Sequence, residues 1–462
     1  MNRPLLYKSL TILALMTLLL MPLSMIKGLV HERQIRRDTV VTEIAQTSTG
    51  EQTVTGPFLV VPYKETISEE KTFTVNGVVQ TVTKDRVAQH YKYLLPEELT
   101  IDGEVRTEER SRGIFTVPVY TARLRLRSTF ALAAHLDIAE NPQKITWGQA
   151  SVVLGVSDIR GIQRTVTLKL DETPLTFAPG TSVEGVPQGI HAPLKTLQDF
   201  TAPRQLTFDI QMDLQGMKRL GVLPVGRDTH LKLASAWPHP SFEGRFLPVA
   251  REITDAGFTA NWETSFLASN MAQHFADCLE RKNCVEFNGN LLTTAFIQPV
   301  DIYLQGERSL KYAILFVGLT FLAFFLFEIL KSLQIHPIQY GLVGAALALF
   351  YLLLLSLSEH IAFPLAYVSA SVVCVGMLGF YVSFVLGSVR RGLGCSSAFA
   401  GLYGALYMLI RSEDHALLMG TLLLTVALVV VMVITRKVDW YQVSRDIRDA
   451  SLGEASTAVV RE

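Results

Sequence analysis

The segment SLSEHIAF places Glu359 and His360 side by side within a long apolar part of the sequence. A carboxylate beside an imidazole can bind a metal ion or transfer protons, and an ionisable residue inside a membrane suggests a functional site. However, the apolar part from Tyr340 to Leu386 would be roughly 70 Å long as one helix, and a hydrocarbon core is only about 30 Å thick. The chain must turn within it, and Glu359 and His360 are the charged residues available to mark the turn. Pro364 then suits the first turn of the next helix. We predict that the pair faces water or an exported domain, and we keep both residues as candidate binding residues.

Catalytic motifs are absent from the sequence, which has no H-E-x-x-H, G-x-S-x-G, P-loop, G-x-G-x-x-G or C-x-x-C pattern. The ten histidines are scattered rather than placed at metal-ligand spacing. We therefore predict a protein that is not an enzyme and that has no cofactor and no metal. A hydrolase acting at the outer leaflet is a less favoured alternative. It would have to use the polar residues of two connectors, which are Glu359, His360, Glu413, Asp414 and His415.

The sequence WPHPSFEGRFLP contains the second pair of candidate binding residues, Trp237 and His239. Prolines on both sides of the histidine favour an extended or turn conformation and exclude a helix. The segment could be a rigid recognition loop, or a turn whose aromatic side chains close the end of a β-sandwich. The second interpretation is favoured, because no reactive partner lies nearby in the sequence.

Two of the four cysteines, Cys278 and Cys284, lie six residues apart in DCLERKNC. On an unbroken helix they would point to different faces, so a bond between them requires the helix to end near Asn283. An oxidising compartment favours a disulfide, which would stabilise the fold by roughly 2 kcal/mol, although two unrelated thiols remain the alternative. Cys374 and Cys395 fall in apolar segments and are interpreted as packing residues.

The elements that must position these residues follow from hydropathy. Hydrophobic residues make up 49% of the chain and charged residues 18%, with no net charge, so a nucleic-acid partner is excluded.

An apolar run near the N-terminus ends without a small-residue cleavage site and indicates a retained anchor rather than a cleaved signal. Five further spans are predicted, and short polar connectors separate them: 311–330, 340–357, 361–386, 395–410 and 417–435.

The distribution of lysine and arginine predicts a multi-pass protein of an inner membrane with both termini in the cytoplasm. In this topology, most of the basic residues that flank the spans fall inside, and the SEH connector falls outside. The predicted domains are a cytoplasmic N-terminus at 1–8, an anchor helix at 9–26, a periplasmic domain at 27–310, a five-helix bundle at 311–435 and a cytoplasmic tail at 436–462.

The exported domain is predicted to be mainly β and sandwich-like, as one domain or two. Alternating residues in RLRLRSTFALAAHL, QRTVTLKL and RQLTFDIQMDL are typical of strands with one buried face. GPFLVVPYK is expected to form a short strand bounded by prolines, and one helix is expected in TSFLASNMAQHFADCLERKN.

Ionisable residues are nearly absent from the spans, which argues against a proton-coupled transporter. Glu328 is expected to pair with Lys331, one turn later. A transporter or lipid-handling protein would require a polar cavity in which the remaining polar residues meet. Those residues are Glu328, Arg411, Tyr340, Tyr367, Tyr381 and Tyr403.

Several phrases of the sequence together resemble one family. They are WPHPSFEGRFLP, LKYAILFVGLTFLAFFLFE, HPIQYGLVGAALALFYLLLLSLSEH and the terminal VDWY, in this order. They are similar to the CreD family of cell-envelope integrity inner-membrane proteins of Gram-negative bacteria. The resemblance implies an inner-membrane protein with a large periplasmic domain, associated with envelope integrity, colicin tolerance and responses to cell-wall-active antibiotics. It implies no catalytic residues.

The function that we predict is therefore a structural or binding role in the envelope. The β domain would bind a periplasmic or envelope partner, and the helical bundle would contact the lipid bilayer.

Overall fold

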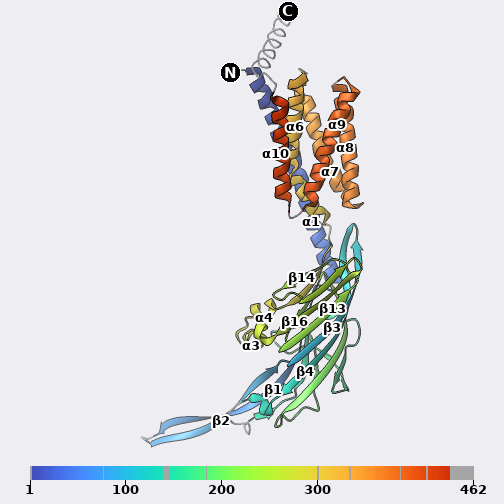
Figure 1. Cartoon of the computed structure of the whole chain (residues 1–462). Coiled ribbons are helices and arrows are strands. Elements are labelled where there is room, and N and C mark those ends of the chain that lie inside the picture. Colours follow the sequence, from blue (N-terminus) through green and yellow to red (C-terminus); the bar gives the residue numbers. More distant parts are fainter. Residues whose placement is uncertain are drawn as a thin grey trace, which may run out of the picture. The chain divides into compact units, whose positions relative to one another are not determined.

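The computed structural model has two compact units, which consist of Met1–Asp38 with Val300–Glu462, and of Thr39–Pro299. Figure 1 shows the helices of the first unit and the sheets of the second. The structure describes residues 3–75, 78–138, 145–183, 185–298, 301–331, 335–385, 387–412 and 415–436. We refer to the first unit as the membrane unit and to the second as the β domain.

The membrane unit is helical. Its elements are α1 (Arg3–Thr47), of which the first part belongs to this unit, α5 (Ile302–Lys311), α6 (Ala313–Lys331), α7 (Pro337–Ser358), α8 (Phe363–Val385), α9 (Val389–Arg411) and α10 (Ala416–Thr435). By length and composition, five helices of the described chain could cross a membrane, and a sixth span results if α5 and α6, bent by 43°, form one. The predicted anchor and the predicted C-terminal spans correspond to these helices.

The turn predicted at Glu359 and His360 is confirmed. α7 begins with a capping box at His336 and with Pro337 in its first turn, and it ends at Ser358 with Glu359 as its C-cap. α8 starts four residues later, at Phe363. The long apolar part of the sequence is therefore two antiparallel helices, because one helix could not fit within the bilayer.

The β domain contains two mixed sheets that share one hydrophobic core. The nine-stranded sheet has the order β14-β17-β12-β1-β6-β10-β9, and β2 and β5 also pair with β1. Its strands are β1 (Gln52–Val75), β2 (Val78–Leu94), β5 (Ile145–Trp147), β6 (Ser151–Val156), β9 (Ala178–Pro179), β10 (Gly189–Pro193), β12 (Arg219–Leu223), β14 (Pro240–Gly244) and β17 (Leu292–Phe296).

The eight-stranded sheet has the order β15-β16-β13-β3-β4-β11-β7-β8. Its strands are β3 (Glu98–Arg112), β4 (Phe115–Leu132), β7 (Thr167–Leu170), β8 (Thr173–Leu175), β11 (Arg204–Met217), β13 (Asp228–Ser235), β15 (Ala250–Thr254) and β16 (Gly257–Ser265). Along β4, Arg123, Arg125 and Arg127 are exposed while Leu124 and Leu126 are buried, so the predicted alternation is confirmed.

One core, rather than two, holds the β domain together. Buried residues of both sheets belong to a single cluster, for example Phe58 of β1 and Leu124 of β4. Tyr120 of β4 also connects the sheets, since its ring packs on Phe296 of β17 and its hydroxyl donates to the carbonyl oxygen of Arg219 at 2.6 Å. The tyrosine is fully buried, so this hydrogen bond satisfies a group that would otherwise be costly to bury. The two sheets therefore form one sandwich-like domain.

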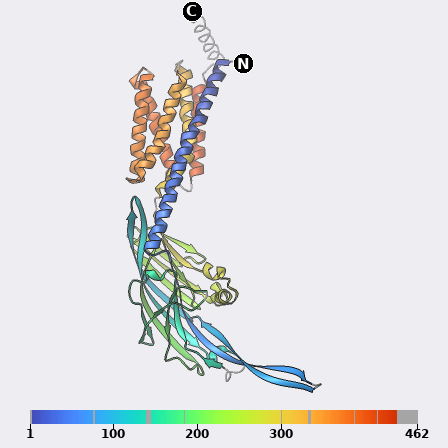
Figure 2. The same cartoon turned by 180° about the vertical axis from the view of Figure 1, so that it is seen from behind.

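β1 is much longer than the short strand that we expected in GPFLVVPYK. It passes through Pro57 and Pro62 and pairs with β2 from Leu59↔Leu94 to Val75↔Val78. A shift in register against β6 between Thr55 and Phe58 accommodates the first proline. The two strands form a hairpin that extends beyond the other strands of its sheet, in light blue in Figures 1 and 2. The side-chain pattern could not reveal this length, because neither face of a two-stranded hairpin has to be apolar throughout.

The two compact units divide the chain at points other than 27 and 310, the limits predicted for the periplasmic domain, and those limits stay a prediction. α1 continues as one helix to Thr47, and Figure 2 shows it in blue as an unbroken helix. The boundary falls within it, at Asp38, and the second boundary falls just before α5. Hydropathy predicts where the apolar run ends but says nothing about where the helix ends, because a polar helix can continue beyond a membrane.

The last turn of α1 is fixed inside the β domain by Arg160. Its guanidinium donates to the carbonyl oxygens of Gln46 at 2.7 Å and Ala45 at 3.3 Å, and it forms an ion pair with Asp158 at 2.6 Å. A cation at a helix C-terminus satisfies free carbonyls and opposes the negative end of the helix dipole. The hydrogen bond from Arg160 holds the pKa of Asp158 below its usual value.

Candidate functional site: a polar cluster on α1, α5 and α7

Glu359 lies at the C-terminus of α7 and is almost enclosed, since its side chain is 9% exposed. Two groups from other helices contact the carboxylate. The hydroxyl of Tyr303, on α5, donates to Oε1 at 3.1 Å, and Nε of Arg33, on α1, lies 3.5 Å from the same oxygen. A buried carboxylate needs such partners, because removing a charge from water is expensive without them.

Asp301 and Arg37 extend this cluster by one further ion pair. Asp301 is the N-cap of α5, and its Oδ1 accepts hydrogen bonds from the backbone nitrogens of Tyr303 and Leu304 at 3.0 Å and 3.2 Å. Its Oδ2 accepts a hydrogen bond from Nη1 of Arg37. The guanidinium carbon of Arg37 also lies 5.9 Å from the centre of the Tyr303 ring.

These five residues form what we call the polar cluster: Arg33, Arg37, Asp301, Tyr303 and Glu359. It contains two arginines and two carboxylates, so its charges balance, and it joins α1 to α5 and α7, from which the β domain separates it in the sequence. Because each carboxylate is paired with a cation, neither is a free base or nucleophile. The arrangement suits mechanical attachment of α1 to α5 and α7 better than proton transfer.

The sequence pointed to only one member of this cluster. Of the other four, Arg33 and Arg37 precede the β domain in the sequence, and Asp301 and Tyr303 follow it. No local pattern pairs them with Glu359. Two signals were present, however. Arg33 and Arg37 are four residues apart and therefore share one face of α1, and Asp301 precedes a helix in the position of an N-cap.

His360, the neighbour of Glu359, does not join the cluster. It is exposed in the turn after α7, and its Nδ1 lies 3.0 Å from the carbonyl oxygen of Ser356 in the last turn of that helix. His415 is exposed as well, whereas Glu413 and Asp414 lie outside the described residues. No group of three or more metal-ligating side chains occurs in the described ranges. The contacts of His360 are those of a surface histidine, and its binding role remains a prediction.

Trp237 and His239 lie in the turn before β14, within the β domain. Trp237 Nε1 donates to the carbonyl oxygens of His239 at 3.2 Å and Ile297 at 3.1 Å, and its ring packs against the core. The side chain of His239 is exposed. This geometry matches a turn that covers the end of the sandwich, and a recognition role for either residue remains a prediction.

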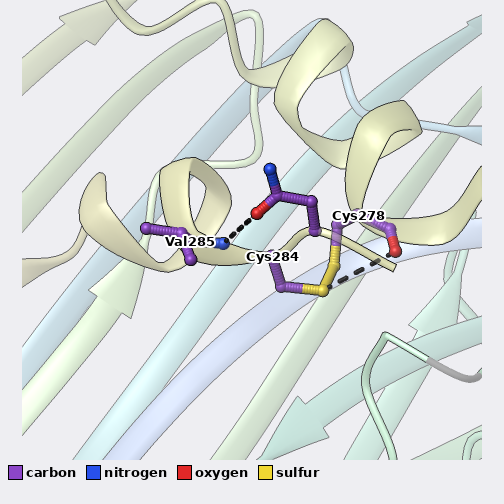
Figure 3. The surroundings of a disulfide bond; sticks show 4 residues. Cys278, Cys284 and Val285 are labelled. Atoms are coloured by element: carbon purple, nitrogen blue, oxygen red, sulfur yellow. Dashed lines mark hydrogen bonds between the residues drawn. A yellow bond between two sulfur atoms is a disulfide. The ribbon is translucent and has the colours of Figure 1, made fainter. Parts of the chain in front are cut away.

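Cys278 and Cys284 are joined by a disulfide, with their Cα atoms 4.2 Å apart (Figure 3). The expected helix is split by Asn270 into α2 (Phe266–Ser269) and α3 (Met271–Arg281), and Lys282 ends α3 in the left-handed region with φ 56°. The helix therefore stops where the bond requires it. Cys284 precedes the short helix α4 (Val285–Gly289), so the disulfide holds α3 and α4 together at the surface of the domain.

The polar residues of the spans fall into two separate groups within the described part of the bundle. Glu328 is buried and accepts hydrogen bonds from the Tyr340 hydroxyl at 2.9 Å and from the backbone nitrogen of Ile335 at 3.1 Å. The side chain of Lys331, its predicted partner, lies outside the description. The second group is Tyr367, whose hydroxyl donates to the carbonyl oxygen of Tyr403 at 2.7 Å, with Cys374 3.0 Å from the Tyr403 hydroxyl.

Arg411 and Tyr381 contribute to neither group, since Arg411 is exposed and Tyr381 is half-buried. Cys374 is buried in the core of the bundle, as expected of a packing residue. The polar residues named above thus do not meet in one cavity, and each group is satisfied within a packed interior.

The fold and the cluster define a class: a multi-pass membrane protein with a large sandwich-like domain inserted between its first and second membrane helices. Comparison with known proteins then identifies the family. The family model of inner membrane protein CreD matches residues 4–441. The chain is also 37% identical over 444 residues to inner membrane protein CreD of Escherichia coli strain K12, covering 96% of this chain and 95% of that protein. The chain belongs to the CreD family.

Proposed function

We propose that this protein contributes to the integrity of the cell envelope and to its response to stress or antibiotics by binding a periplasmic or envelope partner through its β domain. Both termini would lie in the cytoplasm and the β domain in the periplasm. The proposal includes no catalytic step, since the carboxylates of the polar cluster are already paired with cations.

The observation that supports partner binding most directly is the β1–β2 hairpin. Beyond Glu65, where β5 stops pairing with β1, the hairpin has no third strand among the described pairings. An isolated two-stranded ribbon is marginally stable in water, and its unpaired edges can accept a further strand. Ile67, Val87 and Tyr91 are exposed along it. A long arm with exposed apolar side chains and without a third strand in the described pairings is typical of an interaction surface.

A shortened hairpin tests this proposal. Glu65 and Ala88 are opposite each other in the register, so residues 66–87 can be replaced by an Asn-Gly turn that leaves the β5 pairing intact. In a strain lacking the gene, this variant should be folded and abundant in the membrane but should fail to restore resistance to envelope stress. A control variant, Asp255→Ala in the turn between β15 and β16, should restore it. Full restoration by the shortened variant would refute hairpin-mediated binding.

The absence of catalysis has its own test. Alanine substitution of Glu359 should impair function only as far as it reduces the amount of folded protein. A single polar substitution that leaves the protein folded and abundant but abolishes its function would contradict the non-enzymatic proposal.

A further inference from the structure

An apolar groove runs along one side of the membrane unit, between α6, α9 and α10. Its volume is about 710 Å³, which is within the range of small-molecule sites in proteins. Representative lining residues are Leu319, Phe324, Leu402 and Val430. The groove is bounded on one flank by α10, none of whose residues is buried. Figure 1 shows α10 at the margin of the bundle.

Small residues of α9 create the space. Gly394, Ala398, Gly401 and Ala405 recur along one face of the helix, and all four line the groove. Such a stripe usually allows a neighbouring helix to approach closely. On this face of α9 no helix packs closely against the glycines, because a Cβ atom added to Gly394 or Gly401 would meet nothing within 4 Å. By contrast, one added to Gly379 would collide with Ser396, so α8 and α9 do pack closely.

The dimensions fit an acyl chain. Along α9 the lining extends from Arg391 to Ala405, which is about 21 Å at 1.5 Å per residue. Along α10 it extends from Leu423 to Ile434, about 16 Å. One leaflet contributes about half of a 30 Å hydrocarbon core, so the groove is about as deep as a leaflet.

Charge at one end distinguishes this groove from an ordinary lipid-facing surface. Among the described residues that line the groove, one is charged. This residue, Arg391, lies in the first turn of α9. α9 and α10 are consecutive and joined by a short connector, so the start of α9 is level with the end of α10. Arg436 follows that end directly. A guanidinium at headgroup depth above an apolar slot is complementary to a phosphate joined to an acyl chain.

We propose that this groove binds an anionic phospholipid, with an acyl chain between α6, α9 and α10 and with its phosphate on Arg391. In the topology proposed above, this lipid comes from the cytoplasmic leaflet. The bound chain fills the space beside α9 and thereby attaches α10 to the rest of the bundle.

Native mass spectrometry of the purified full-length protein in detergent tests the proposal. Phosphatidylglycerol and phosphatidylcholine with identical acyl chains would be titrated separately. The wild type should retain phosphatidylglycerol about tenfold more strongly, as expected for a charge-assisted contact. Arg391→Gln should remove this preference. Arg390→Gln is the matched control, since Arg390 is exposed and does not line the groove, and it should keep the preference.

The apolar part of the site has its own pair of variants. Gly401→Leu should weaken the binding of both lipids by filling the groove. Gly376→Leu should not, because Gly376 is an equally open glycine on α8 that lies outside the groove. Ala398→Leu replaces Gly401→Leu if the latter does not fold. The proposal is overturned if Arg391→Gln and Arg390→Gln behave alike, if the groove-filling leucine has no more effect than Gly376→Leu, or if inorganic phosphate alone displaces the lipid.

Discussion

Removal of the Tyr303 hydroxyl should measure how firmly the polar cluster holds α5 to α7. The variant Tyr303→Phe keeps the ring, which is 2% exposed, and removes one hydrogen bond to a carboxylate. A hydrogen bond to a charged group contributes about 1.5–3 kcal/mol. The described contacts then leave Glu359 with Arg33, at 3.5 Å. We therefore expect the free energy of unfolding to fall by about 2 kcal/mol.

A second variant, Glu359→Gln, and its combination with Tyr303→Phe complete a double-mutant cycle. The amide oxygen can still accept from Tyr303, but the charge opposite Arg33 is lost. Because the Arg33 side chain is 43% exposed, its ion pair is screened and contributes only about 0–1 kcal/mol. The expected loss for Glu359→Gln is about 1–2 kcal/mol, and the double variant should lose about 1 kcal/mol less than the sum of the two single variants.

Equilibrium unfolding of the purified protein in mixed micelles measures these differences. Tyr312→Phe is the matched control, because Tyr312 is half-buried at the other end of α5 and the described part of the chain shows no hydrogen bond from its hydroxyl. Its effect should stay within about 0.5 kcal/mol. Equal effects of Tyr303→Phe and Tyr312→Phe, or strict additivity in the cycle, would refute the coupling between Tyr303 and Glu359.

Further predictions concern the β domain of the full-length protein. Replacing Cys278 and Cys284 together by serine should lower stability by about 2 kcal/mol, and a reductant should then shift the unfolding of the wild type but not of the variant. Arg160→Ala should accelerate hydrogen exchange in the last turn of α1, because the carbonyl oxygens of Ala45 and Gln46 lose their donor, and unchanged exchange there would contradict this. The hydrogen bond from Arg160 lowers the pKa of Asp158, so its contribution is present above the unfolded-state pKa of about 3.9 and is lost as pH falls through the folded-state value. Asp158→Asn should therefore flatten the loss of stability below about pH 4, whereas Asp255→Asn should not.

The membrane helices were predictable because the bilayer imposes a length on them. The apolar part around Glu359 exceeded that length, so a turn was required, and the charged residues identified its position. The alternation in β4 was predictable for a similar reason, since burial of one face of a strand fixes every second residue. In both cases a local pattern reports directly on contact with water or lipid.

The polar cluster could not be predicted in this way. Tyr303 and Glu359 are 56 residues apart, the whole β domain lies between Arg33 and both of them, and their contacts depend on how α1, α5 and α7 pack. The contacts of Glu328 show the same limit. The i,i+3 spacing pointed to Lys331, and this pairing stays a prediction. No spacing along the helix could indicate the two contacts that the structure gives from beyond it, the backbone nitrogen of Ile335 and the Tyr340 hydroxyl. Spacing along a helix identifies neighbours on that helix only.

The charges of the β domain give a further reason to regard the hairpin as the binding surface. On the exposed face of the eight-stranded sheet, arginines of β4 pair across strands with carboxylates. Arg125 contacts Asp209 at 2.6 Å, and Arg127 contacts Asp102 at 3.1 Å. The hydrogen bond from Arg125 holds the pKa of Asp209 below its usual value, so this carboxylate stays ionised and paired in mild acid.

A charged partner at this face would have to displace ion pairs that already neutralise one another, and it would gain little in exchange. The hairpin presents the opposite situation. Its backbone groups beyond Glu65 lack a third strand in the described pairings, and a partner strand would satisfy them without displacing an internal contact. Recognition through backbone hydrogen bonds depends little on ionic strength, whereas recognition through the arginine face would weaken as salt rises. Binding that persists at high salt in the wild type and is lost with the shortened hairpin would therefore place the partner on the hairpin rather than on the sheet.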